Sequence, residues 1–208
     1  MFKVGYYDDE NRQYDSYRKD FALHKIELIR IENIFLKSEI RDFILENKFD
    51  AIIIDFCLDK FTKLDFKDGN ELTRYLNTEI LDFPTIILTS YAKQSREEKL
   101  VSNTLIFDRN VLASDTDGIE YTEFINLILN SIEVFRKRML VNKEEFEELF
   151  AKKKKNSISS FEEDRLMQIY RNLFSYELID EINPELLRRS LEKKMDDILV
   201  ELRKITGE

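Results

Sequence analysis

The sequence has 208 residues, 36% of them charged, and a formal net charge of −9 at pH 7. This length accommodates one full domain and a smaller one, and the 43% of apolar residues can form a core, which excludes a disordered chain. The negative net charge argues against general nucleic-acid binding, because contact with the phosphate backbone needs a basic face. We find neither a signal peptide nor an apolar run long enough to cross a bilayer, so we expect a cytoplasmic protein.

A single cysteine, Cys57, and a single histidine, His24, limit the chemistry that the chain can carry. One cysteine cannot form an internal disulfide, and one residue of each kind makes a poor zinc site. Cys57 lies in an apolar run, so we expect it to be a small core residue. We place His24 on the surface at the start of a strand, which leaves a metal-dependent hydrolase without a general base.

Short apolar runs alternate with segments of helical spacing as far as residue 137. We expect strands at 2–7, 26–31, 51–54, 85–89 and 104–107, and helices at 11–23, 34–46, 70–81 and 120–139. Asp68-Gly69 is expected to form a turn before the third helix. Five strands that alternate with helices predict an α/β domain with right-handed crossovers. Ligands of such sheets bind beyond the carboxyl ends of the strands.

The character of the sequence changes after residue 139, where no further strand is indicated. We therefore divide the chain into an α/β domain at 1–139 and a helical segment at 140–208. Within this segment, Ser160 and Glu163 have the spacing of a capping box and predict a helix that continues to about residue 174.

A last helix is predicted from Asn183-Pro184, which supply an N-cap and a first helical residue, to about residue 205. Its apolar stripe consists of Leu187, Leu191, Met195, Ile198, Leu202 and Ile205. The stripe either packs on neighbouring helices of a small bundle or forms a homodimer contact, and it is short for a coiled coil. The four lysines at 152–155 either contact phosphate or form a solvated helix end near the negative pole of the helix dipole, and we favour the helix end.

Acidic residues follow two of the predicted strands at the point where each strand ends. Asp8, Asp9 and Glu10 come after the first strand, and Asp55 comes directly after the third. Because the carboxyl ends of parallel strands share one edge of a sheet, we expect these carboxylates to converge. Converging carboxylates repel one another unless a cation compensates them, and their oxygen atoms suit Mg2+. The sequence therefore predicts Mg2+ as a cofactor.

Four motifs follow one another in the order of the landmarks of a known signalling module. They are Tyr6-Tyr7-Asp8-Asp9-Glu10, Ile53-Ile54-Asp55, Asp68-Gly69 and Pro84-Thr85-Ile86-Ile87-Leu88-Thr89-Ser90. On the basis of these motifs, the chain resembles a response-regulator receiver domain. The resemblance covers about two thirds of the chain. The resemblance implies a flavodoxin-like, doubly wound sheet of five parallel strands in the order 2-1-3-4-5, followed here by a small all-helical C-terminal segment. It also implies two-component phosphorelay signalling.

The resemblance assigns roles to individual residues. Asp55 would be the phosphoryl acceptor, a carboxylate nucleophile that forms an aspartyl phosphate. The implied Mg2+ ligands are Asp8, Asp9, Asp55 and the backbone carbonyl of Cys57. Thr89 would donate a hydrogen bond to a phosphoryl oxygen, and the small Ser90 would leave access for the phosphoryl donor.

The sequence departs from the family pattern at three places. Arg109 stands where receivers carry a lysine that pairs with the acceptor carboxylate. Arginine keeps the positive charge, but its forked guanidinium is wider than the ammonium of lysine. Ile106 stands at the position of the aromatic switch residue. The loop between Asp55 and Asp68 is about six residues longer than the family norm, and the extra length falls within residues 60–67.

We therefore expect a response-regulator-like protein that is phosphorylated by a sensor histidine kinase or a phosphotransfer protein and transmits its state through the helical segment. It would not be an enzyme, apart from its own phosphorylation and slow autodephosphorylation. A non-phosphorylated pseudo-receiver that acts as a protein-interaction module is an alternative, motivated by Arg109, Ile106 and the long loop. A nucleic-acid-binding output is a further alternative, supported only by the lysine run.

Overall fold

A computed structural model describes residues 1–10, 13–112 and 118–179 of the chain. The chain divides into two compact units, Met1–Lys137 and Arg138–Glu208. Within the described residues, no helix is both long and apolar enough to span a membrane.

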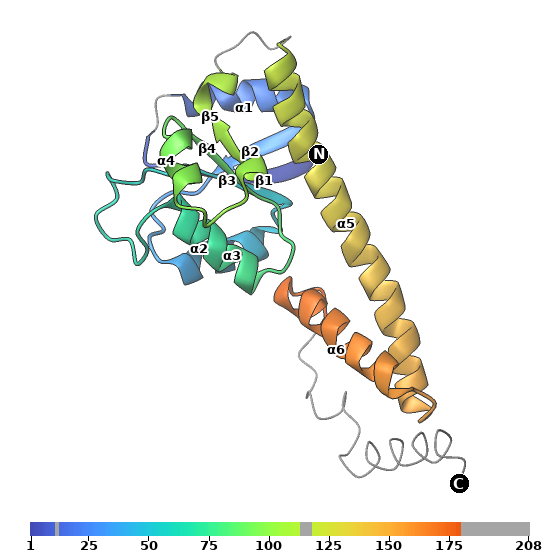
Figure 1. Cartoon of the computed structure of the whole chain (residues 1–208). Helices are drawn as coiled ribbons and strands as arrows, with labels where there is room; N and C mark the ends of the chain where they lie inside the picture. Colours follow the sequence, from blue (N-terminus) through green and yellow to red (C-terminus); the bar gives the residue numbers. More distant parts are fainter. Residues whose placement is uncertain (11–12, 113–117, 180–208) are drawn as a thin grey trace. The chain divides into compact units, whose positions relative to one another are not determined.

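The first unit is built on a sheet of five parallel strands in the order β2-β1-β3-β4-β5 (Figure 1). The strands are β1 (Phe2–Tyr7), β2 (Ile26–Arg30), β3 (Ala51–Ile54), β4 (Thr85–Thr89) and β5 (Ile106–Asp108). The helices are α1 (Tyr14–Leu23), α2 (Lys37–Asn47), α3 (Gly69–Glu79), α4 (Ala92–Glu97) and the start of α5 (Ile119–Lys154). This is the flavodoxin-like, doubly wound arrangement, so the predicted fold class is confirmed.

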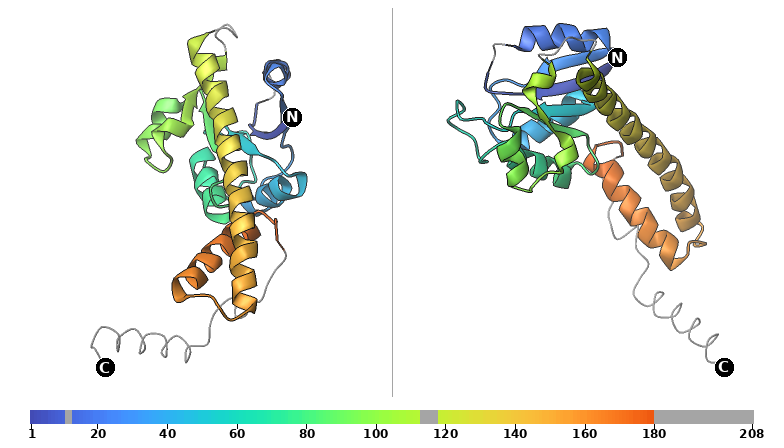
Figure 2. Two further views of the ribbon diagram at one scale, coloured as in Figure 1. Left: turned by 90° about the vertical axis from the view of Figure 1, so that its right-hand side faces the viewer. Right: turned by 45° about the horizontal axis from the view of Figure 1, so that its top comes forward.

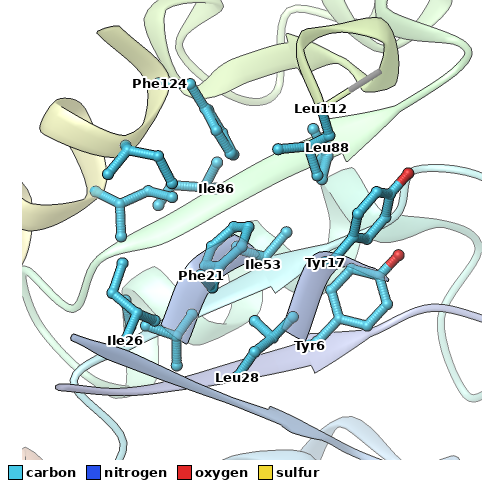
Figure 3. Close-up of a cluster of buried hydrophobic side chains, with 14 of the residues drawn as sticks. Tyr6, Tyr17, Phe21, Ile26, Leu28, Ile53, Ile86, Leu88, Leu112 and Phe124 are labelled. Carbon is cyan, nitrogen blue, oxygen red and sulfur yellow. The ribbon is translucent and has the colours of Figure 1, made fainter. Parts of the chain in front are cut away.

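Helices cover both faces of the sheet, with α1 and the start of α5 on one side and α2 and α3 on the other (Figures 1 and 2). Alternate strand residues such as Val4, Tyr6 and Ile53 face α1 and α5 in one buried cluster (Figure 3). The residues between them, such as Ile52 and Ile54, are fully buried as well. Burial on both faces explains why the central strands are continuous apolar runs.

Several element boundaries differ from the prediction, and two of them bear on the site. α2 begins at Lys37 rather than at residue 34, and its first N–H is held by Oδ1 of Asp65 at 2.8 Å. β5 begins only at Ile106, because Asn103–Leu105 form a 3-10 turn. The sheet therefore has a short last strand, and residue 109 follows it directly.

Asp68-Gly69 was predicted to form a turn before α3. In the structure these two residues form the start of α3 itself. The Asp68 side chain caps the helix by accepting the N–H of Glu71 at 3.0 Å. A Cβ atom on Gly69 would lie 2.1 Å from the carbonyl oxygen of Asp55. Only glycine therefore lets the helix start approach the residue that ends β3 so closely.

α5 is much longer than the predicted 120–139, since it continues from the first unit into the second and ends at Lys154. No glycine or proline interrupts residues 119–154, so nothing in the sequence stops the helix where its charge pattern changes. Within the first unit, Arg136 of α5 donates two hydrogen bonds to Asp50, at 2.7 and 2.8 Å.

In the second unit, the end of α5 packs against α6 (Ser160–Ser175). Their buried side chains include Phe146, Leu149, Leu166, Ile169 and Leu173. The capping box at the start of α6 is formed by Ser159 and Glu162, one residue earlier than predicted. Ser159 has the extended backbone of an N-cap, whereas Ser160 is already helical.

The lysine run lies at the C-terminal end of α5, as the helix-end interpretation predicted. Two of its members are paired within the second unit: Lys152 with Glu162 at 2.6 Å, and Lys153 with the buried Glu163. These pairs reduce the positive charge that the run presents to a phosphate. The predicted last helix at 183–205 and its apolar stripe lie outside the described residues.

Candidate functional site

Three carboxylates meet beyond the carboxyl ends of β1 and β3. Tyr7 and Ile54 are paired in register, so Asp8 and Asp55 are the next residues on neighbouring strands. The main-chain N–H of Asp55 donates to the carbonyl of Tyr7 at 2.9 Å and extends this pairing. One carboxylate oxygen from each of Asp8, Asp9 and Asp55 lies within 4.8 Å of the others. The structure thus brings together three of the four carboxylates that the sequence placed at this edge, and Glu10 is not part of the cluster.

Asp55 is the most chemically distinctive member of this acidic pocket. It is 5% exposed, and its Oδ1 accepts no hydrogen bond from the residues that the structure describes. Burial raises the pKa of Asp55 to about 6, although the Arg109 charge and the Thr89 hydroxyl lower it. Asp8 and Asp9 add to the increase through their negative charges. At neutral pH Asp55 is mainly a carboxylate, and its Oδ1 has no donor among the described residues.

Arg109 supplies the positive charge of the pocket. It follows β5 directly, and its Nη2 lies 2.8 Å from Oδ2 of Asp8 and 3.1 Å from Oδ2 of Asp55. Burial alone would lower the pKa of the guanidinium, but the charges of Asp8 and Asp55 outweigh this and raise it. The guanidinium therefore stays charged between two carboxylates that would otherwise repel each other. Its Nε is also buried and donates no hydrogen bond within the described part of the chain.

Tyr6 donates a hydrogen bond to a carboxylate of the pocket, a role that was not predicted from the sequence. Its hydroxyl donates to Oδ2 of Asp8 at 2.5 Å, while the N–H of Glu10 donates to Oδ1 at 2.7 Å. The Tyr6 ring lies beside Tyr17, and both hydroxyls point to the same end of the core cluster (Figure 3). Burial, together with the charge of Asp8, raises the pKa of Tyr6, so the phenol stays a donor. Tyr6 lies in β1 two residues before Asp8, which follows the strand, and that spacing was the available signal.

The two residues predicted at the end of β4 differ in exposure. Thr89 is fully buried, and its Oγ1 accepts the N–H of Tyr91 at 3.2 Å. Ser90 is exposed. Ile106, at the position of the aromatic switch residue, is buried, whereas its neighbour Phe107 packs on Phe124 with ring centroids 4.9 Å apart.

Cys57 is not a core residue, contrary to the prediction. β3 ends at Ile54, so Cys57 lies half-buried in the loop that follows. Burial raises the pKa of its thiol to about 11, and its hydrogen bond to Asp59, 3.1 Å from Sγ to Oδ2, acts in the same direction. The thiol is therefore protonated at neutral pH and a poor nucleophile. The metal-binding role of its backbone carbonyl stays a prediction.

The loop at 56–67, here called the Lys60 loop, is attached to the acidic pocket. The main-chain N–H of Lys60 donates to Oδ2 of Asp9 at 2.7 Å, and its ammonium pairs with Glu10. The length of this loop was evident from the sequence, but its contact with Asp9 was not predicted. A main-chain N–H is common to almost every residue type, so the identity of residue 60 gave no signal for it.

The donor set of the pocket suits a hard divalent cation. All its side-chain donors are carboxylate oxygens, which is the chemistry that Mg2+ prefers. The buried Oδ1 of Asp55, which has no protein donor among the described residues, is an atom that such an ion would satisfy. Asp8, Asp9 and Asp55 could therefore hold Mg2+.

Comparison with solved structures gives several matches to this chain. The receiver domain of a Francisella response regulator is 19% identical, with a TM-score of 0.45, and the match covers 64% of this chain and 98% of that one. A response regulator receiver domain protein from Clostridium thermocellum is 18% identical, with a TM-score of 0.43, covering 67% and 99%. These two matches to the present chain are both receiver domains. The receiver domain is also the family that the sequence motifs resemble.

A third match is a trimeric coiled-coil segment of yeast Spc42 fused to another structure. It is 12% identical, with a TM-score of 0.45, and the match covers 66% of this chain and 80% of that one. No protein-family model and no curated protein matches the sequence. The strand order of the first unit, 2-1-3-4-5, is itself the order found in the receiver fold.

Proposed function

We propose that this protein is a phosphorylatable signalling protein of the response-regulator type, with Asp55 as the phosphoryl acceptor. One observation carries the proposal: Asp55 has a buried carboxylate whose Oδ1 accepts no hydrogen bond from the described residues, and it lies between an acidic pair and Arg109. A carboxylate in this position can act as a nucleophile toward a phosphoryl group. The raised pKa of about 6 still leaves it ionised at neutral pH.

In the proposed reaction, an oxygen of Asp55 attacks the phosphorus atom of the donor. The new bond joins this oxygen to phosphorus, and the bond from phosphorus to the leaving group breaks. With acetyl phosphate the leaving group is acetate, which takes the electron pair. Arg109 is placed to donate to a phosphoryl oxygen, since its Nε has no acceptor within the described residues.

Asp8, Asp9 and Asp55 would hold Mg2+, and by family resemblance the backbone carbonyl of Cys57 would join them. When bound, the ion neutralises charge on the phosphoryl oxygens. Tyr6 would keep Asp8 oriented toward the pocket through its 2.5 Å hydrogen bond. Thr89 and the exposed Ser90 keep the roles that the resemblance implies, as a hydrogen-bond donor to the phosphoryl group and as a small residue at the entrance.

The proposed partner is a sensor histidine kinase or a phosphotransfer protein, which would supply the phosphoryl group. The helical segment would carry the output, by contact with a partner or by forming a homodimer. α5 belongs to both units, which supports it as the element that connects acceptor and output. We propose no catalytic activity beyond phosphorylation of the chain itself and slow autodephosphorylation.

Phosphorylation by acetyl phosphate in the presence of Mg2+ tests the proposal. We expect the wild type to gain one hydroxylamine-sensitive phosphoryl group, as an aspartyl phosphate is, and Asp55→Asn to gain none. Asp59→Asn is the matched control, because Asp59 is an exposed carboxylate in the nearby loop. Undiminished phosphorylation of Asp55→Asn would show that Asp55 is not the acceptor.

A non-phosphorylated interaction module is the second candidate, and one observation favours it. Arg109 already lies within 3.1 Å of both Asp8 and Asp55, so the pocket is partly neutralised by the protein itself. Titration with beryllofluoride and Mg2+ separates the candidates. Binding that is lost in Asp55→Asn supports the phosphorylatable protein, and absence of binding supports the interaction module.

A further inference from the structure

The Lys60 loop is held firmly on both sides of Lys60. Before it, Leu58 is 2% exposed, and after it, Phe66 is 7% exposed. Phe61 packs on the rings of Tyr7 and Phe35, with centroids 5.4 and 5.6 Å away. These apolar contacts place the exposed Lys60 at the edge of the acidic pocket.

Lys60 contacts the pocket through two different groups. Its main-chain N–H donates to Oδ2 of Asp9, and a hydrogen bond of 2.7 Å to a carboxylate is among the stronger kinds. Its ammonium pairs with the carboxylate of Glu10. Both partners of this ion pair are exposed, at 57% and 42%, so the pair is modest in strength and accessible to change.

These contacts compete with the use of Asp9 as a metal ligand. Oδ2 of Asp9 accepts the Lys60 N–H, so the lone pair that takes part in this hydrogen bond points toward the loop and not toward an ion. The nearby ammonium also repels a second cation. A divalent cation that binds Oδ2 of Asp9 therefore competes with the Lys60 N–H for that oxygen.

We propose that Lys60 is a positioning residue that restrains Asp9 through these contacts, and that divalent-cation binding at Asp9 releases the Lys60 loop. This inference rests on the proposed metal site and adds to it a competing group on the chain itself. It makes the affinity of the pocket for Mg2+ depend on a contact outside the carboxylates. It also makes the loop, at the entrance of the pocket, responsive to the ion.

Calorimetric titration of the full chain with Mg2+ tests the first part. Lys60→Met removes the ammonium but keeps the main-chain N–H, and we expect it to bind Mg2+ about two- to five-fold more tightly, the effect of one exposed ion pair. Lys63→Met is the control, because Lys63 is an exposed lysine of the same loop. It should bind as the wild type does.

A double-mutant cycle with Glu10→Gln distinguishes the contact from simple charge repulsion. If Lys60 acts through its pair with Glu10, Lys60→Met should change the affinity little in the Glu10→Gln background. If the effect is only repulsion between the ammonium and the ion, it will persist in that background, and the proposal is overturned.

Hydrogen exchange of the loop provides a readout that is independent of affinity. Mg2+ should accelerate amide exchange across 56–67 in the wild type, because the Lys60 N–H loses its acceptor. Protection of the loop by Mg2+ would overturn the proposal. Equal Mg2+ affinity of wild type and Lys60→Met would also overturn it while leaving the metal site intact. Failure of both proteins to bind Mg2+ at tens of millimolar would overturn the metal site as well.

Discussion

Arg136 donates two hydrogen bonds to Asp50, the residue that precedes β3, whereas Asp55 follows the same strand. The distances are 2.7 Å from Nε to Oδ1 and 2.8 Å from Nη2 to Oδ2, a bidentate pair. Asp50 also accepts the main-chain N–H of Lys3 at 2.9 Å, and the Arg136 guanidinium lies 4.7 Å above the ring of Phe2. One strand of four residues thus has the helix-binding carboxylate before it and the candidate acceptor after it.

Loss of this bidentate pair should destabilise the first unit. Arg136→Ala leaves the carboxylate of Asp50, which is 6% exposed, with the Lys3 N–H as its one donor among the described residues. Since the arginine itself is about half exposed, we expect a loss of about 1–2 kcal/mol in the free energy of unfolding. Urea unfolding followed by circular dichroism measures this loss. Lys137→Ala, at the next exposed position of α5, should change it little, and equal effects of both variants would contradict the assignment.

The acidic pocket could be predicted because parallel topology imposes it. Once β1 and β3 were recognised as neighbouring parallel strands, Asp8 and Asp55 had to lie at one edge of the sheet. Arg109 was predicted only through the family resemblance, since composition gives no reason for its position. Its contacts with both carboxylates, at 2.8 and 3.1 Å, come from the structure.

Other features could not be predicted because backbone geometry determines them. The close approach of Gly69 to Asp55 depends on where α3 begins, and Asp68-Gly69 equally suits a turn. The Lys60 contact uses a main-chain N–H across 51 residues of sequence. The extension of α5 to Lys154 was missed because the helix was ended where the strand signals stop, after residue 139, although no helix-breaking residue occurs there.

The stability of the protein should depend on pH through Asp55. Its pKa is raised from 3.8 to about 6 by burial, so the folded state binds a proton more readily than the unfolded chain. The free energy of unfolding therefore falls as the pH rises from about 4 to about 7. Asp55→Asn lacks this titration, and its stability relative to the wild type should increase by roughly 2–3 kcal/mol over that range.

Urea unfolding of metal-free wild type and Asp55→Asn at several pH values measures this difference. Asp59→Asn serves as the control, since Asp59 is exposed. A stability difference that does not vary between pH 4 and pH 7 would show that Asp55 is not buried in the manner described.

Gly69→Ala should disturb Asp55 directly. The new Cβ would lie 2.1 Å from the Asp55 carbonyl oxygen and 3.0 Å from a side-chain carbon of Ile54, so the backbone must shift. We expect a loss of about 1–3 kcal/mol in the free energy of unfolding, the usual cost of overpacking, and slower phosphorylation by acetyl phosphate. Arg74→Ala, at an exposed position of the same helix, should preserve both properties. Wild-type phosphorylation by Gly69→Ala would contradict the importance of this close approach.

Arg109 should control both the ionisation and the reactivity of Asp55. Its charge lowers the pKa of Asp55, so Arg109→Met should raise that pKa above about 6, whereas Arg109→Lys should keep it closer to the wild-type value. Carbon NMR titration of the Asp55 carboxyl group in the metal-free protein measures these changes. Because Arg109→Met also removes a donor to the transferred phosphoryl group, we expect phosphorylation to be slower by about a hundredfold.

Arg109→Lys separates charge from geometry in this prediction. A single ammonium replaces a fork whose Nη2 contacts both Asp8 and Asp55, so the lysine variant should recover the pKa more fully than the rate. If both variants leave the pKa of Asp55 unchanged, the guanidinium does not interact with the carboxylate in solution. If Arg109→Lys reacts faster than the wild type, the wider fork of arginine obstructs phosphoryl transfer, and Arg109 slows the reaction instead of assisting it.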